Sequence, residues 1–152
     1  MSPRRQRIEK VIDHRSKELD KRVAELSRSK AREAEARQRA EAEQAALQHA
    51  SETRMKLAGA EIAAKNWVEA NEWLQTRAAL AANADNLVVK ARTVTARAQQ
   101  HVLSARGELK KVELLSERLV HEERVVTERV ERRLEDEIAA LRFSNDRSRG
   151  EQ

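Results

Sequence analysis

Histidine is the residue type in this sequence best suited to binding a metal, and its spacing argues against that chemistry. The four histidines are scattered along the chain at His14, His49, His101 and His121. A zinc-binding protease helix needs two histidines four residues apart, with a glutamate after the first. The stretch "HEERV" begins like such a helix at His121, but Val125 stands where the second histidine is required. We therefore expect solvent-facing or seam-edge histidines and no metal site.

Other catalytic and cofactor chemistry is equally hard to build from this sequence. The three glycines, Gly59, Gly107 and Gly150, lie dozens of residues apart and cannot form a phosphate-cradling loop. A serine-histidine-aspartate arrangement needs a cleft that excludes water, which a bare helical hairpin does not offer. The sequence therefore predicts no catalytic residue, no cofactor and no enzyme activity.

The two tryptophans are the residues most suited to binding a protein partner. Trp67 and Trp73 stand in "KNWVEANEWLQTRAALAANADN", and the only other aromatic residue is Phe143. On a helix, residues six apart point about 120° from one another, so a narrow seam does not easily bury both tryptophans. Either both close the end of a helical seam as local core, or at least one is an exposed anchor of the kind favoured at interfaces.

Arginines gather near both ends of the chain, and they admit two interpretations. They are a solvated surface that also compensates the helix dipole, or they form a docking end for an acidic partner. If the chain folds back on itself, its termini lie together and the clusters combine into one basic tip. The arginines concerned are Arg4, Arg5, Arg7, Arg129, Arg132, Arg133, Arg142, Arg147 and Arg149.

Composition indicates that long helices must position these residues. Charged residues make up 38% of the 152 residues, hydrophobic residues 39%, and the only proline is Pro3. This mixture is typical of a coiled coil, and its apolar content disfavours the alternative of a disordered chain. The lack of cysteine fits a reducing compartment. No apolar run approaches the ~20 residues of a membrane span, so we expect a soluble cytoplasmic protein.

Hydrophobic periodicity predicts two helices, over about residues 4–58 and 67–143. In the first, Ile12, Leu19 and Leu26 are seven apart. The second carries a longer heptad series and then a spacing of four, which predicts a coiled coil that relaxes near its end. We expect "SNDRSRGEQ" (residues 144–152) to be a flexible tail. The apolar residues of the second series are Ala98, Ala105, Val112, Leu119, Val126, Val130, Leu134 and Ile138.

A turn over about residues 59–66, with Asn66 as the cap of the second helix, folds the chain back on itself. The predicted fold is all-α: one long two-helix antiparallel coiled-coil hairpin over residues 1–152, roughly 80 Å long at ~1.5 Å per residue. "NADN" (residues 83–86) is a second candidate turn. The alternative is a continuous helix in a parallel dimer.

Two segments resemble FliJ, the stalk family of flagellar type III export. "NWVEANEWLQTRAAL" is similar to the segment after the turn, with two aromatic residues each followed by a hydrophobic one. "ERVERRLEDEIAALRF" is similar to the closing helix. The short YscO-type injectisome proteins share the size and the hairpin character. The Ala/Arg-rich first helix and the short turn depart from the family pattern.

The resemblance implies a non-enzymatic central stalk of the export apparatus, at the cytoplasmic face of the inner membrane. In that family the paired termini enter the export ATPase hexamer and stimulate it, and the turn end contacts the export gate. Secretion chaperones are further implied partners, and the flagellar and injectisome systems both stay open. Carried over by position, the gate contacts are Trp67, Trp73, Leu74 and Arg77, and the ATPase contacts are Arg4, Arg5, Arg7, Arg132, Arg133 and Arg142.

Two other classes of function compete with this one. The first is a generic coiled-coil adaptor or dimeric scaffold unrelated to export. The second is a nucleic-acid-binding helical protein, which the net charge of +5 permits. Acidic residues are interleaved with the basic ones, and no aromatic residues stand among the arginines to stack on bases. Nucleic acid is therefore the less favoured partner.

Overall fold

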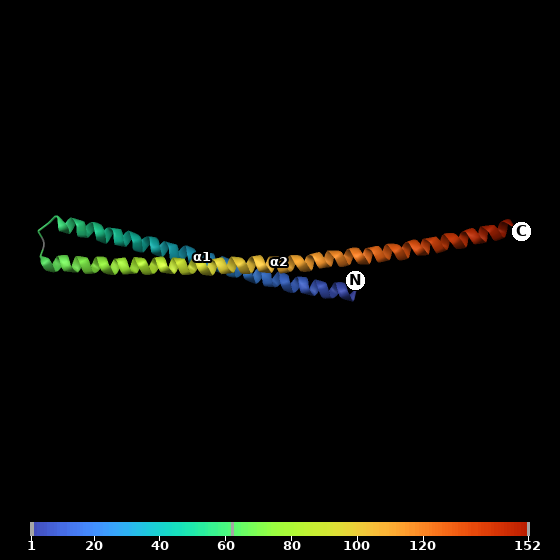
Figure 1. Ribbon diagram of the computed structural model, residues 1–152, viewed down its shortest axis with the longest axis horizontal. Coiled ribbons are helices and arrows are strands. Elements are labelled where there is room, and N and C mark those ends of the chain that lie inside the picture. Colours follow the sequence, from blue (N-terminus) through green and yellow to red (C-terminus); the bar gives the residue numbers. More distant parts are fainter. Residues whose placement is uncertain (1, 62, 152) are drawn as a thin grey trace. The chain divides into compact units, whose positions relative to one another are not determined.

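Two long helices make up almost all of the described chain. The computed structural model describes residues 2–61 and 63–151. Helix α1 spans Pro3–Ala58 (56 residues) and helix α2 spans Ala64–Gly150 (87 residues), with no strand among the described residues (Figure 1). The predicted all-α fold is confirmed, and α1 and α2 pack against each other as an antiparallel hairpin.

The start of α1 follows from its first residues. Pro3 stands at the first helical position, where its missing N–H removes no helical hydrogen bond. Ser2 caps the helix, because its hydroxyl accepts a hydrogen bond from the backbone N–H of Arg5 at 3.2 Å. After Pro3 no proline follows, and alanine, glutamate, arginine and glutamine fill the middle of α1. These are strong helix formers, which explains why 56 residues run without a break.

The turn is shorter than the sequence suggested. The described residues between the helices are 59–61 and 63, and Ala60 N–H donates to the carbonyl of Leu57 at 3.2 Å. Helix α2 already begins at Ala64, because the Ala63 carbonyl accepts hydrogen bonds from Asn66 N–H (3.0 Å) and Trp67 N–H (3.3 Å). Asn66 therefore lies inside the first turn of α2, which corrects its predicted role as the cap.

The second candidate turn, residues 83–86, is part of α2. Ala84 is buried in the contact with α1, and Asp85 accepts a hydrogen bond from Gln44 Nε2 at 3.0 Å. These contacts across the hairpin outweigh the local preference of asparagine and aspartate for turns.

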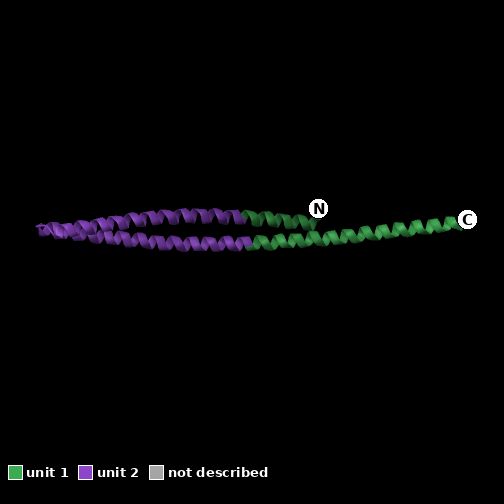
Figure 2. Cartoon of the chain, turned by 90° about the horizontal axis from the view of Figure 1, so that it is seen from above, with its two compact units in different colours: residues 1–17, 107–152 green, residues 18–106 purple. Residues whose placement is uncertain are grey.

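The chain divides into two compact units, which Figure 2 distinguishes by colour. Unit 1 consists of residues 1–17 and 107–152, and unit 2 of residues 18–106. In unit 2, residues of α1 face residues of α2 in descending order. Arg22 lies 3.4 Å from the His101 ring, and Gln44 bonds to Asp85. This order is the signature of an antiparallel pair.

The seam of unit 2 is built mainly from small residues. Its least exposed positions recur at alternating steps of three and four residues, as in a coiled coil. Ala40, Ala84 and Val88 form a cluster against which Ala36 packs. Short side chains let the two backbones approach closely, so contacts between the helices replace the large apolar core that the sequence lacks. The buried residues of this seam are Ser29, Ala40, Ala50, Ala81, Ala84, Val88, Thr95, Ala98 and Val102.

In unit 1 the paired part of the helices ends well before α2 does. Leu119 is buried, and the Ser2 hydroxyl is hydrogen-bonded to the Glu123 carboxylate. Every residue of α2 from Val126 to Gly150 is exposed, although Val126 and Thr127 still line a depression with Pro3 and Arg4 of α1. The chain ends therefore do not meet. Ser2 lies beside Glu123, which corrects the expectation that the termini lie together.

The predicted flexible tail is also helical, as far as Gly150. Helix α2 continues past Phe143 because no proline interrupts it and its side chains support the last turns. Ser148 donates to the Ser144 carbonyl at 3.0 Å, and Arg147 forms an ion pair with Glu151 at 3.9 Å. Arg147 and Arg149 also complement the negative end of the helix dipole.

The small-residue seam generates a stability prediction. Ala81 is only 1% exposed, whereas its neighbour Ala82 faces solvent. We expect Ala81→Leu to lower the free energy of unfolding by about 1–3 kcal/mol, because a larger side chain forces the helices apart. Ala82→Leu should change it by less than about 0.5 kcal/mol. Urea unfolding followed by circular dichroism measures both, and equal values for the two variants would contradict a tightly packed seam.

Candidate partner-binding surfaces

Trp67 belongs to the seam at the turn end of unit 2. It is half-buried, and seven-residue steps relate it to the seam positions Leu74 and Ala81. The guanidinium of Arg54, on α1, lies 5.3 Å from the centroid of the Trp67 ring. A cation at this distance is attracted to the face of the ring. Trp67 therefore helps to fasten α1 to the start of α2.

Trp73 has the opposite character. It is 52% exposed, and its ring lies on the surface of α2 one turn before Arg77. The Arg77 guanidinium lies 4.3 Å from the ring centroid. Trp67 and Trp73 therefore lie on different sides of α2, as their six-residue spacing predicts.

Arg77 connects Trp73 to the seam. Its side chain is 27% exposed, and its terminal nitrogen lies 3.6 Å from Oε2 of Glu43 on α1. That oxygen is buried and makes no hydrogen bond in the described structure, so Arg77 supplies its nearest compensating charge. Removing one partner of such a pair leaves a poorly solvated charge. The ion pair with Glu43 thus positions the Arg77 guanidinium, and the guanidinium in turn restricts the orientation of the exposed Trp73 indole.

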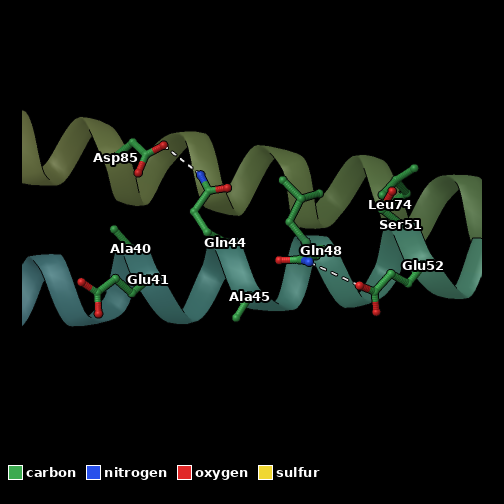
Figure 3. Close-up of a pocket in the computed structure, with 10 residues that line it drawn as sticks. Ala40, Glu41, Gln44, Ala45, Gln48, Ser51, Glu52, Leu74 and Asp85 are labelled. Carbon is green, nitrogen blue, oxygen red and sulfur yellow. Dashed lines mark hydrogen bonds between the residues drawn. The ribbon is translucent and has the colours of Figure 1, made fainter.

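Leu74 lies on a different side of α2 from Trp73. It is half-buried and lines a shallow depression between the helices, together with Ala40, Gln44 and Asp85 (Figure 3). Figure 3 also shows the bond from Gln48 to Glu52 on the rim of this depression. Glu41, Glu52 and Asp85 give it an acidic character. Of the four predicted gate contacts, the structure brings together Trp73 and Arg77, while Trp67 and Leu74 line the seam.

The predicted ATPase-contact arginines form two groups within unit 1. Arg4 and Arg7 are exposed and line a depression with Leu119, Glu122 and Val126, whereas Arg5 is half-buried. The second group lies on the part of α2 that extends beyond its contact with α1, and all of its members are exposed: Arg132, Arg133 and Arg142. The first group lies on α1 beside residues 119–127 of α2, and the second lies further along α2, so they do not form the single tip that the sequence suggested.

Sequence reasoning missed Arg54 and Glu43, and the reason is geometric. Arg77 stands four residues after Trp73, so helical spacing alone predicts their contact. Arg54 and Glu43 lie on the other helix, and their partners are fixed only by the register of the hairpin. An antiparallel register counted from the turn would bring Arg54 near Trp67, which is the signal that was available.

No group of three metal-binding side chains occurs in residues 2–61 and 63–151. Within the same ranges, no helix is long and apolar enough to cross a membrane.

Two helices paired along a narrow heptad seam define an all-α coiled-coil hairpin. The sequence pattern of the family described as "Flagellar FliJ protein" matches residues 4–148. The chain belongs to this FliJ family, and is therefore a component of flagellar type III protein export. The family is export-associated and is not known as an enzyme. No curated protein and no solved structure matches the chain.

The different surroundings of the two tryptophans generate a second prediction. We expect Trp67→Ala to lower the free energy of unfolding by about 2 kcal/mol, because it removes half-buried seam surface and the partner of Arg54. Trp73→Ala should cost at most about 1 kcal/mol, the value of an exposed cation–ring contact. Urea unfolding of both variants measures the difference, and an equal loss would mean that both indoles are core residues.

Proposed function

We propose that this protein is a non-enzymatic stalk of the flagellar export apparatus, which stimulates the export ATPase hexamer and contacts the export gate. Family membership supports the export role, and the exposed arginines of unit 1 support the ATPase contact. The observation that carries the ATPase part is the segment of α2 after Val126. It presents Arg132, Arg133 and Arg142, interleaved with acidic residues, on a helix that α1 does not cover. We place the protein in the cytoplasm, at the cytoplasmic face of the inner membrane.

The ATPase contact in this proposal is electrostatic. Arg4 and Arg7 on α1 and the exposed arginines at the end of α2 face solvent, so a partner with an acidic lining attracts them from a distance. Exposed charges of this kind mainly speed association and make it depend on salt. Arg5 is half-buried, and we assign it to the support of Arg4 and Arg7. The α2 arginines concerned are Arg132, Arg133 and Arg142.

The gate contact in this proposal is Trp73 with Arg77. An exposed indole held by a stacked guanidinium provides a large contact area with little conformational freedom to lose, which is typical of interface hot spots. Trp67 and Leu74 serve this surface indirectly, since they hold the seam beneath it. On the family resemblance alone, we add secretion chaperones as further partners.

Charge reversal on α2 tests the ATPase contact. We expect Arg132→Glu combined with Arg133→Glu to raise the concentration needed for half-maximal stimulation of the cognate ATPase on the order of tenfold at low salt. Lys90→Glu combined with Arg106→Glu is the matched control, since both residues are exposed and the net charge changes equally. ATP hydrolysis is measured over a titration of the protein at two salt concentrations. No stimulation by the unaltered protein at low salt would refute the proposal.

A substitution of Trp73 tests the gate contact. We expect Trp73→Ala to weaken binding to the cytoplasmic domain of the export gate roughly thirtyfold, the loss of about 2 kcal/mol that defines a hot spot. Val68→Ala is the control, because Val68 is equally exposed, at 52%, and lies elsewhere on α2. Calorimetric titration gives both affinities. Equal affinities of the Trp73 variant and the unaltered protein would remove Trp73 from the interface.

A further inference from the structure

A line of exposed apolar side chains runs along α2 within unit 2. Trp73, Leu80, Leu87 and Val94 recur at steps of seven residues and are 52%, 42%, 45% and 49% exposed. Each stands one residue before a seam position, so the line borders the seam along one side. From Trp73 to Val94 it extends about 30 Å at ~1.5 Å per residue. A heptad line of this kind is what a helix presents to another helix, and α1 does not cover it.

The line forms one wall of a groove whose other wall is α1. Leu80 and Leu87 line a depression with Arg32 and Arg39, and its floor includes Ala36 and Ala84. The next depression is lined by Val94 and, again, by Arg32. Its floor includes Ser29 and Ala98, and Arg28 and Arg97 stand at its rim. Because Arg32 lines both, the depressions follow one another along the same side of the hairpin. Small side chains in the floor keep the groove open.

The rim of this groove is basic. Among the described residues, Arg28, Arg32 and Arg97 take part in none of the ion pairs within 4.0 Å, and Arg39 pairs with the exposed Glu35 at 3.2 Å. The other acidic residues that line the groove are occupied. Glu25 is paired with Arg22 and Glu43 with Arg77. The groove therefore offers apolar contacts from α2 and a rim of positive charge, most of it on α1.

The opposite side of the hairpin lacks the basic rim and the heptad line of exposed apolar residues, and its apolar lining consists of Leu47 and Leu74 with alanines. Its depression carries Glu41, Glu52 and Asp85 and no arginine, and Gln44 bridges the two helices there by its bond to Asp85. At the corresponding steps of seven, α2 places Ala78, Asp85 and Arg92 on that side, with no large apolar residue. The seam residues alone pair α1 with α2, so the exposed apolar line and the basic rim on one side are not explained by that pairing.

We propose that the groove from Leu80 to Val94 binds an amphipathic helix of a protein partner, which carries apolar residues at heptad spacing and an acidic edge. The apolar side chains of this third helix pack between Leu80, Leu87 and Val94, and its acidic edge faces Arg28, Arg32 and Arg39. From Leu80 to Val94 the groove extends about 21 Å at ~1.5 Å per residue, which corresponds to about 14 residues of helix. The inference does not rest on the ATPase or gate contacts proposed above, since none of its contact residues belongs to them.

A second copy of this chain is the weaker occupant, because its free apolar surface has the wrong charge. The unpaired segment of α2 presents Val130, Leu134 and Ile138, each about half exposed. Residues 126–143 contain five acidic and four basic side chains, so the flanks of that surface are almost neutral. The basic rim of the groove favours a partner of clear negative charge.

Two synthetic peptides of about 21 residues test the proposal, with leucine at heptad positions and either glutamate or lysine along the edges. Fluorescence anisotropy measures their binding to the full chain. We expect the glutamate-edged peptide to bind at least tenfold more tightly than the lysine-edged peptide. Leu87→Ser combined with Val94→Ser should weaken it at least tenfold. Val89→Ser combined with Leu103→Ser is the matched control, since both residues are exposed on α2 and lie outside the groove.

A charge swap makes the test specific. Arg32→Glu combined with Arg39→Glu should reverse the preference, so that the lysine-edged peptide binds more tightly. Circular dichroism verifies that each variant keeps its helicity. Equal binding of the two peptides, or equal weakening by the control substitutions, would overturn the proposal. So would a concentration-dependent dimer in sedimentation that Leu87→Ser and Val94→Ser dissolve, because the groove would then be a self-association surface.

The same variants separate this inference from the proposed function. ATPase stimulation and Trp73-dependent gate binding should be unchanged in Leu87→Ser combined with Val94→Ser, while peptide binding is lost. Retention of peptide binding together with unchanged stimulation would refute the groove and leave the stalk role standing.

Discussion

The close contact between α1 and α2 through small side chains is the interaction on which the rest of this structure depends. The chain has one phenylalanine, no tyrosine and few large aliphatic residues, so it cannot surround a layered core. It can bring two backbones near each other along Ala40, Ala84 and their neighbours, and gain many weak contacts per unit of length. Such a seam leaves most of each helix surface in solvent. Because the seam buries only one stripe of each helix, the remaining side chains are available to form the partner-binding surfaces described above.

Charged residues at seam positions favour one register of α1 against α2. Alanines pair with alanines in several registers at similar energy, whereas Glu43 has its compensating charge only where Arg77 faces it. Arg92 lies 3.8 Å from Glu33 in the same antiparallel order. A half-buried ion pair contributes little net stability, yet a shifted register would leave its charges unpaired. These pairs therefore act mainly on the choice of register, and through it on the position of Trp73.

The two helices and their pairing could be predicted from the sequence, and each prediction that was wrong has a specific physical cause. Apolar residues recur every seven positions in each helix, as at Leu19 and Leu26 in α1 and at Val112 and Leu119 in α2. This periodicity predicts both helices, because it marks the stripe of residues that each helix buries. Asn66 and residues 144–150 were misjudged because turn and cap preferences are weak locally and helix continuation overrides them. The meeting of the chain ends was misjudged although the predicted helices, over about residues 4–58 and 67–143, are already unequal in length. A longer second helix must extend beyond the first, as α2 does beyond α1.

The basic groove beside Leu87 was not apparent from periodicity. The exposed apolar residues that line it each stand one residue before a seam position, so in the sequence they cannot be told from the seam itself. Only when Arg32 and Arg39 are brought opposite Leu80 and Leu87 does the line become one wall of a surface. A sequence pattern reports one helix at a time, whereas a surface shared by two helices needs their register.

The last turns of α2 have a thermodynamic consequence. From Glu128 onward every described residue of this helix is exposed, and the segment is held by local contacts such as the 3.0 Å hydrogen bond from Ser148 to the Ser144 carbonyl. Most helical stability in proteins comes from packing of an amphipathic face, which this segment lacks, so it can unwind without disturbing the seam. A protein that binds this segment must offset the conformational entropy that the segment loses when it becomes ordered. Such complexes form with modest affinity, dissolve readily, and suit a component that has to engage and disengage repeatedly.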